Sequence, residues 1–197
     1  MSFLIGLTGS IGMGKSTTAR LFAAEGCDIW DADAAVHRLY DVGGLAVESI
    51  ATAFPDAVHE GAVSRDALKT IISNDPTALH RIEEIVHPLV TADRRAFVAK
   101  ATSDIVVLDI PLLFEGGGAH DMDATVVVTA PPAVQRERVL ARGAMTEAQF
   151  EMILSKQMPD AEKRKRATYI VLTDTVEHAS EQVAAIVAEV RKGLENA

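Results

Sequence analysis

A glycine-rich loop between a short apolar run and an amphipathic segment constrains this chain more than any other feature. Residues 9–16 read Gly-Ser-Ile-Gly-Met-Gly-Lys-Ser, a complete match to the pattern G-x-x-x-x-G-K-[ST]. The apolar run at residues 3–8 predicts a buried parallel strand, and residues 16–25 carry helical spacing that ends at Gly26. A strand, a phosphate-binding loop and a helix in this order predict an α/β protein that binds a nucleoside triphosphate.

The fixed positions of this loop have chemical tasks. Its glycines let successive backbone N–H groups turn toward the β-phosphate, and the positive end of the following helix reinforces them. Lys15 can bridge the β- and γ-phosphates, and the Ser16 hydroxyl can bind Mg²⁺. Asp109 ends an apolar run at residues 105–109. Because parallel strands present their carboxyl ends at one edge, Asp109 is expected near Lys15, holding Mg²⁺ through water or only capping a loop.

The rest of the chain alternates short apolar runs with longer amphipathic segments, as α/β proteins do. Residues 34–100 are mostly helical, with expected breaks at Asn74-Asp75-Pro76 and His87-Pro88 and no expected strand. The expected strands cover residues 3–8, 27–30, 105–109, 124–129 and 169–172; the later helices cover residues 132–142, 146–156 and 176–194. These predict a doubly wound, five-stranded parallel sheet with an inserted helical lobe and a lid-like segment.

Composition limits the function classes. The chain has 197 residues, of which 48% are hydrophobic, so one domain with a substantial core fits. The net charge of −9 disfavours nucleic acid as a partner. A single cysteine, Cys27, excludes an intramolecular disulfide, and neither a secretory signal nor an apolar run long enough to span a membrane is present. These features predict a cytoplasmic protein, with a monomer as the expected state.

Further residues favour a small-molecule kinase over other phosphate-loop proteins. Asp31 and Asp33 follow the second expected strand, where a carboxylate can orient a substrate hydroxyl and take its proton. The alternative is that one or both only cap the next helix, above all Asp33, which directly precedes the helix expected from residue 34. Arg138 and Arg142 lie four residues apart on one helical face and can neutralise a transferring phosphoryl group, whereas Arg136 is expected to be solvated.

Other motifs leave alternatives open. The basic run at residues 163–166 is either a solvated helix face or a positive patch for an anionic substrate. A guanine-nucleotide switch is disfavoured because the chain lacks an Asn-Lys-x-Asp motif, and its one D-x-x-G match, at residues 41–44, follows a helix. The remaining alternatives are a kinase for nucleosides or other metabolites, an ATP-sensing regulator without phosphotransfer, and an RNA-associated protein.

An ordered set of motifs resembles the dephospho-coenzyme A kinase family of phosphate-loop kinases over nearly the whole chain. The set comprises residues 5–17 around the loop, Asp-Ala-Asp at 31–33, Ile-Val-His-Pro-Leu-Val at 85–90, Pro-Leu-Leu-Phe-Glu at 111–115, residues 135–142, and Gln157. The loop alone indicates only a nucleotide-binding protein, whereas the later motifs are far more specific. There are two departures from the family pattern. Ser10 and Met13 occupy variable loop positions, and residues 167–174 lack both the Asp that the family has directly after Ala and the Asn of the turn toward the adenine.

This resemblance implies phosphorylation of the 3′-hydroxyl of dephospho-coenzyme A by ATP and Mg²⁺, the last step of coenzyme A biosynthesis. It implies a core at residues 1–33, 101–142 and 167–197, a coenzyme A-binding lobe at about 34–100 and a lid at about 143–166. Asp33 would be the base, with Lys15, Arg138 and Arg142 as the other catalytic residues and Ser16 and Asp109 at the metal. The implied ATP set is Gly9, Ile11, Gly12, Met13, Gly14, Lys15, Ser16, Thr17 and Arg142; the implied acceptor set is Thr8, Asp33, His87, Pro111 and Leu112.

Overall fold

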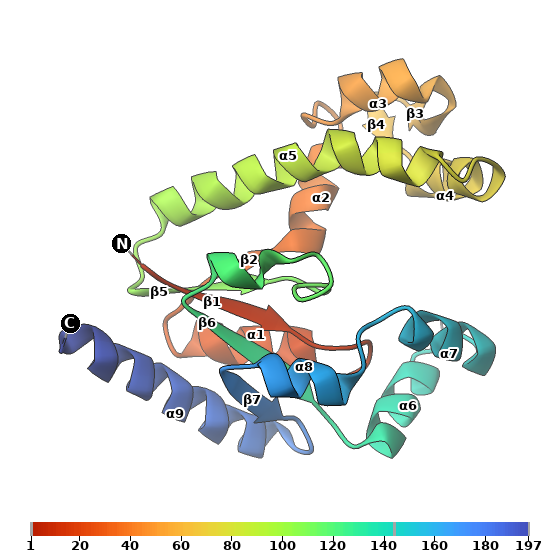
Figure 1. Ribbon diagram of the computed structural model, residues 1–197. Helices are drawn as coiled ribbons and strands as arrows, with labels where there is room; N and C mark the ends of the chain where they lie inside the picture. The colour runs from red at the N-terminus through yellow and green to blue at the C-terminus, as the bar shows by residue number, and fades with distance from the viewer. Residues whose placement is uncertain (1, 144, 197) are drawn as a thin grey trace. The chain divides into compact units, whose positions relative to one another are not determined.

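A five-stranded sheet with the order β2-β5-β1-β6-β7 forms the centre of the first of two structural units (Figure 1). The computed structural model describes residues 2–143 and 145–196, so Met1, Ala197 and Ala144, which the expected core and lid include, lie outside the described residues. The second unit is Asp31–Lys100, and the residues before and after it form the first. The strands are β1 (Phe3–Thr8), β2 (Asp28–Asp31), β5 (Ile105–Asp109), β6 (Ala124–Thr129) and β7 (Tyr169–Leu172).

The sheet confirms the expected three-layer α/β fold. Strand β1 pairs in parallel with β5 and β6, and β6 pairs in parallel with β7. Residues of β5 and β6 are buried along their whole length, because helices cover parallel strands on both faces. The register sets Leu7 beside both Asp109 and Val126, two residues before the glycine-rich loop begins.

Within the described residues of the first unit there are six helices. They are α1 (Lys15–Ala24), α6 (Pro132–Ala141), α7 (Glu147–Ser155), α8 (Asp160–Arg166), α9 (Val176–Glu195) and the 3₁₀ helix η2 (Gly118–Asp121). Helices α1 and α9 pack against each other, α1 also contacts β5, and α9 also contacts β7. The core beneath them includes Leu7, Phe22, Val126 and Val183. Thr146 caps α7 with a capping box completed by Gln149.

The second unit has a core of its own, built around Leu39, Ile50, Phe54 and Ile82. It contains α2 (Ala32–Tyr40), α3 (Val47–Ala53), the 3₁₀ helix η1 (Pro55–Ala57), β3 (Val58–His59), β4 (Ala62–Val63), α4 (Arg65–Asn74) and α5 (Ala78–Lys100). The expectation of no strand here was wrong, because β3 and β4 form a short antiparallel hairpin.

The expected helix break at His87-Pro88 was also wrong. Helix α5 runs for 23 residues and contains Pro88. Proline removes one N–H, which would otherwise bond the carbonyl of Glu84. Both Pro88 and Glu84 are exposed, so water can satisfy that carbonyl, while the apolar positions Ile82 and Val86 stay buried on the other face. Burial of this continuous apolar face therefore outweighs the local proline signal.

Candidate active site

The glycine-rich loop connects the central strand β1 to the first turn of α1. Gly12 and Gly14 have φ angles of 78° and 90°, in the left-handed region that favours glycine. A Cβ at position 12 would lie 2.5 Å from Cγ2 of Val139, and one at position 14 would lie 3.1 Å from Oγ1 of Thr173. The loop conformation therefore requires glycine at both positions. Lys15 is the first residue of α1, so the loop N–H groups lead directly into a helix N-terminus.

Lys15 and Asp109 form an ion pair at the carboxyl edge of the sheet. The Lys15 side chain is 18% exposed and that of Asp109 is 2% exposed. Strand β5 places Asp109 there because its register sets Asp109 beside Leu7, just before the loop. Ser16 follows Lys15 in the first turn of α1 and is exposed. The predicted proximity of Asp109 to Lys15 is thus present in the structure.

Thr173 supports the loop from the end of β7, and the sequence reasoning missed it. Its hydroxyl donates to the carbonyl of Met13 at 2.7 Å. Arg138 on α6 donates to both Oγ1 and the carbonyl oxygen of Thr173, at 3.0 and 2.5 Å. A polar residue directly after a strand, at the edge where ligands bind, was the signal that could have identified it. Arg138 is therefore positioned at the loop by a residue in the segment that departs from the family pattern.

The other two arginines of α6 and its C-cap, Arg136 and Arg142, have different surroundings. Arg142 is the exposed C-cap residue of α6. Its backbone is still helical, so it lies about one helical turn beyond Arg138, as expected. Arg136 is exposed, as expected, and donates two hydrogen bonds to Glu147 at the start of α7. That pair ties α6 to α7 rather than serving the phosphate loop.

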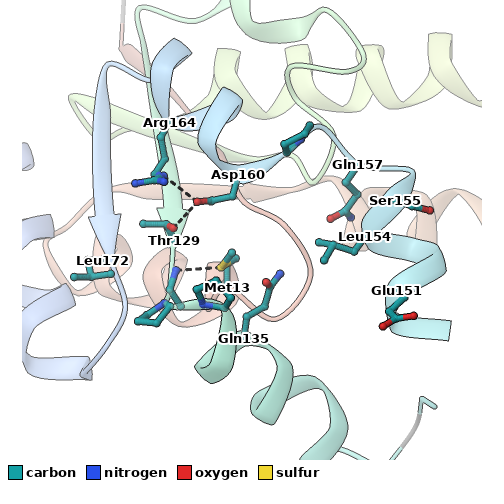
Figure 2. Close-up of a pocket in the computed structure, with 14 residues that line it drawn as sticks. Met13, Thr129, Gln135, Glu151, Leu154, Ser155, Gln157, Asp160, Arg164 and Leu172 are labelled. Carbon is teal, nitrogen blue, oxygen red and sulfur yellow. Dashed lines mark hydrogen bonds and ion pairs between the residues drawn. The ribbon is translucent and has the colours of Figure 1, made fainter. Parts of the chain in front are cut away.

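Two glutamines hold the backbone of Ile11. The Ile11 N–H donates to Oε1 of Gln157 at 3.2 Å, and Nε2 of Gln135 donates to the Ile11 carbonyl at 2.7 Å. Gln157 lies between α7 and α8, whereas Gln135 lies on α6. Both side chains line a cavity of about 740 Å³, together with Met13, Glu151 and Leu154 (Figure 2). Its walls are largely apolar, with Ala130, Pro131, Pro132, Pro159 and Leu172 completing much of the lining.

The basic run on α8 is divided: Arg164, Lys165 and Arg166 are exposed, whereas Lys163 is buried. Lys163 is fully buried and its Nζ lies 2.9 Å from Oε1 of Glu115, which also accepts from the Met158 N–H at 2.9 Å. Arg164 pairs with Asp160 and Lys165 with Glu162. Burial alone would raise the pKa of Glu115, but the Lys163 ammonium and the Met158 N–H outweigh it and lower that pKa below its usual value.

The residues expected at the acceptor fall into both units. In the first unit, the buried Thr8 hydroxyl donates to the Pro111 carbonyl at 2.9 Å, and the following Leu112 is 47% exposed. In the second unit, Asp31 is the N-cap of α2, and its carboxylate accepts from the Ala34 N–H. Asp33 is exposed in the first turn of α2 and is not its cap. His87 is exposed on α5. The alternative of N-capping therefore applies to Asp31, and Asp33 is left available for chemistry.

Comparison with known proteins identifies the family to which the chain belongs. Residues 3–178 match the model of the dephospho-CoA kinase family. The chain is 61% identical over 193 residues to a dephospho-CoA kinase of Ruegeria pomeroyi, with 98% of each chain covered. The chain belongs to the dephospho-CoA kinase family. A further family relative, from Cereibacter sphaeroides, is 60% identical and covers 96% of each chain.

A solved structure shares the fold of the chain. A Thermus thermophilus protein has a TM-score of 0.85 and 34% identity over 95% of this chain and 97% of that one. As a member of the dephospho-CoA kinase family, the chain is a phosphate-loop kinase. Within the described ranges 2–143 and 145–196, no helix is long and apolar enough to cross a membrane.

Proposed function

We propose that this chain transfers the γ-phosphoryl group of ATP to the 3′-hydroxyl of dephospho-coenzyme A, giving coenzyme A and ADP. The observation that carries the proposal is the Lys15–Asp109 pair at the phosphate loop of a dephospho-CoA kinase family member. Phosphoryl transfer requires positioning and charge neutralisation more than covalent chemistry. A loop of N–H donors, an adjacent ammonium and a nearby carboxylate meet that requirement.

The proposed roles follow from the positions of the side chains. Lys15 stabilises the negative charge that shifts between the β- and γ-phosphates during transfer, and Arg138 and Arg142 neutralise the transferring group. Arg138 has five N–H donors, so its two bonds to Thr173 do not exhaust it. Asp33 orients the 3′-hydroxyl and takes its proton as the new P–O bond forms. Thr8, Pro111, Leu112 and His87 complete the proposed acceptor site.

The donor set at the loop fits Mg²⁺. Ser16 offers a hydroxyl and Asp109 a carboxylate, and hard oxygen ligands are those that Mg²⁺ prefers. Among the described residues, no group of three or more His, Cys, Asp or Glu side chains could hold a metal by itself. That fits an ion held jointly by protein oxygens and substrate phosphates. Bound there, Mg²⁺ supplies positive charge to the β- and γ-phosphate oxygens.

The proposal also assigns a role to each of two segments of the chain. Residues 34–100 bind the coenzyme A portion of the acceptor, and residues 143–166 form the lid. The protein acts as a cytoplasmic monomer without nucleic acid. The net charge of −9 supports the exclusion of nucleic acid, and paired basic residues on α8 support it further, because they offer no extended positive surface.

The test is ADP release from ATP and Mg²⁺, measured with dephospho-coenzyme A and with a panel of nucleosides and other metabolites. We expect release with dephospho-coenzyme A alone, and a product that carries its new phosphate on the 3′-oxygen. Release with another acceptor would keep the kinase and overturn the substrate. Tight ATP binding without release for any acceptor would favour an ATP-sensing regulator.

A further inference from the structure

Gln157 bonds to the phosphate loop from outside, and no role described so far uses it. Its Oε1 accepts from the Ile11 N–H at 3.2 Å, while Gln135 donates to the carbonyl of the same residue. One residue of the loop thus has both backbone groups held by side chains from two distant elements. Buried or partly buried backbone groups that are held on both sides have little freedom to reorient.

The position of Ile11 matters because the next residues turn sharply. Gly12 follows with a φ of 78° and stands against Val139 and Gln135 of α6. Within the loop, the Met13 N–H donates to the Ser10 carbonyl at 3.1 Å, which closes a turn around Ile11 and Gly12. The direction of the loop N–H groups therefore depends on how Ile11 is held.

The hydrogen bond to Ile11 comes from a segment that lines a cavity together with the loop residue Met13. The 740 Å³ cavity is lined by Glu151, Leu154 and Ser155 of α7 on one side and by Met13 on the other. Figure 2 shows Gln157 between α7 and the loop, reaching toward it. The residue after Gln157 is anchored, since the Met158 N–H donates to Glu115. Gln157 therefore sits at the junction between α7 and the fixed start of α8.

We propose that Gln157 is a positioning residue that couples the segment 143–166 to the phosphate loop by holding the Ile11 N–H. It touches no reacting atom; it keeps the loop in the shape that receives the phosphates of ATP. The inference rests on the proposed nucleotide role of the loop and does not depend on the identity of the acceptor. When α7 shifts, the hydrogen bond to Ile11 is lost and the loop is less well organised for ATP.

The test replaces Gln157 with methionine, which keeps the length of the side chain and removes the acceptor. Binding of a non-hydrolysable ATP analogue with Mg²⁺ is measured by calorimetry without any acceptor. We expect Gln157→Met to bind the analogue about 3- to 10-fold more weakly, the loss of one hydrogen bond. In the assay with acceptor, KM for ATP should rise by the same factor while kcat is unchanged.

Gln149→Met is the matched control. Gln149 is also a glutamine of this segment, but it accepts from the Thr146 N–H within the capping box of α7. We expect it to lower the melting temperature slightly and to leave analogue binding unchanged. A Gln157→Met protein that melts like the wild type and binds the analogue equally well or more tightly would overturn the proposal. Gln157→Leu gives the same comparison if the methionine variant does not fold.

This design separates the two proposals. Analogue binding requires no acceptor, so an incorrect acceptor assignment would leave the ratio between the variants intact. Conversely, phosphorylation of dephospho-coenzyme A with normal KM for ATP in Gln157→Met would sustain the proposed function and remove the positioning role.

Discussion

At the scale of single residues, the ion pair between Lys15 and Asp109 does two things at once. It neutralises a carboxylate that is 2% exposed, and it holds the lysine at the edge of the sheet before nucleotide arrives. The φ angles of Gly12 and Gly14 and the contacts of Thr173 fix the loop around that lysine. A preorganised charge of this kind acts without reorganisation during the reaction.

Replacing Lys15 with methionine should therefore remove the positive charge that stabilises the transferring phosphoryl group. We expect kcat for phosphoryl transfer to fall by about 10²- to 10³-fold, the usual cost of one preorganised electrostatic contact. Steady-state kinetics measure the loss, and circular dichroism checks that the fold is kept. The exposed Lys156 gives the control, since Lys156→Met should leave kcat unchanged. Normal turnover in Lys15→Met would mean that the loop does not serve phosphoryl transfer.

Asp33 and Asp31 form a second matched pair. As the general base, Asp33 should lose about 10²- to 10⁴-fold in kcat on replacement by asparagine, with ATP-analogue binding unchanged. Asp31 caps α2, and asparagine caps helices about as well as aspartate, so Asp31→Asn should leave stability and turnover unchanged. Equal loss of turnover in both variants would show that the two carboxylates share the work.

The residues of the loop could be predicted from the sequence, but its supports could not. Gly12, Gly14 and Lys15 have fixed spacing in a short motif, and each has a local chemical reason. Gln135, Gln157 and Thr173 meet the loop from more than 120 positions away along the chain. No local pattern specifies such contacts, since they depend on how α6 and β7 pack beside β1.

At the scale of elements, the strands were the most predictable part. Each of β1, β5, β6 and β7 is a short, mainly apolar run. Strands β5 and β6 are buried along their whole length, which requires that composition, whereas the edge strand β7 is only partly buried. The hairpin β3–β4 was not predicted, because strands of two residues are too short to show an alternation of apolar and polar residues. The continuity of helix α5 was not predicted, because it depends on apolar packing on both sides of Pro88: Val86 is buried, and the partly buried Leu89 packs against the same core.

The Glu115–Lys163 pair joins α8 to the loop after β5, and its removal should cost stability. Glu115→Gln leaves the buried Lys163 ammonium without its carboxylate, so we expect the free energy of unfolding to fall by about 2 kcal/mol. The cost is below that of a fully buried pair because the Glu115 side chain keeps 20% of its surface exposed. Urea denaturation at pH 7 measures it.

The same pair has a defined pH dependence. The pKa of Glu115 is lowered in the folded protein, so its contribution is present above its unfolded pKa of about 4.3 and is lost as the pH falls through the folded pKa. The stability difference between wild type and Glu115→Gln should therefore shrink below about pH 4. The double variant Glu115→Gln/Lys163→Met should recover stability at pH 7. A constant difference down to acid pH would rule out the ion pair as its cause.

At the scale of the whole molecule, each unit has its own core, and the proposal assigns each a ligand. Hydrogen exchange should separate them. We expect the ATP analogue with Mg²⁺ to protect the loop at residues 9–17, and dephospho-coenzyme A to protect amides within residues 31–100. Protection of the second unit by the ATP analogue alone would contradict the proposed division of labour.

The reactivity of the Cys27 thiol measures how readily the core of the first unit opens. Its thiol is buried in the core, and burial raises its pKa to about 11. At pH 8 the folded protein should thus react with a thiol reagent far more slowly than the urea-unfolded chain, whose thiol has a pKa of about 8.5. Because the unfolded thiol ionises first, stability should also fall as the pH rises above about 8.5. Rapid labelling of the native protein would mean that this core opens readily.

The order of strands in the sheet also affects the order of events during synthesis. Strand β1 leaves the ribosome first, yet both of its neighbours, β5 and β6, follow roughly a hundred residues later. The second unit is contiguous and has its own core, so it can fold on the nascent chain while Phe3–Thr8 is still unpaired. Until residue 109 has emerged, the strand that leads into the phosphate loop has neither partner, and until residue 129 has emerged one of its edges stays unpaired. Such an apolar segment is of the kind that chaperones hold.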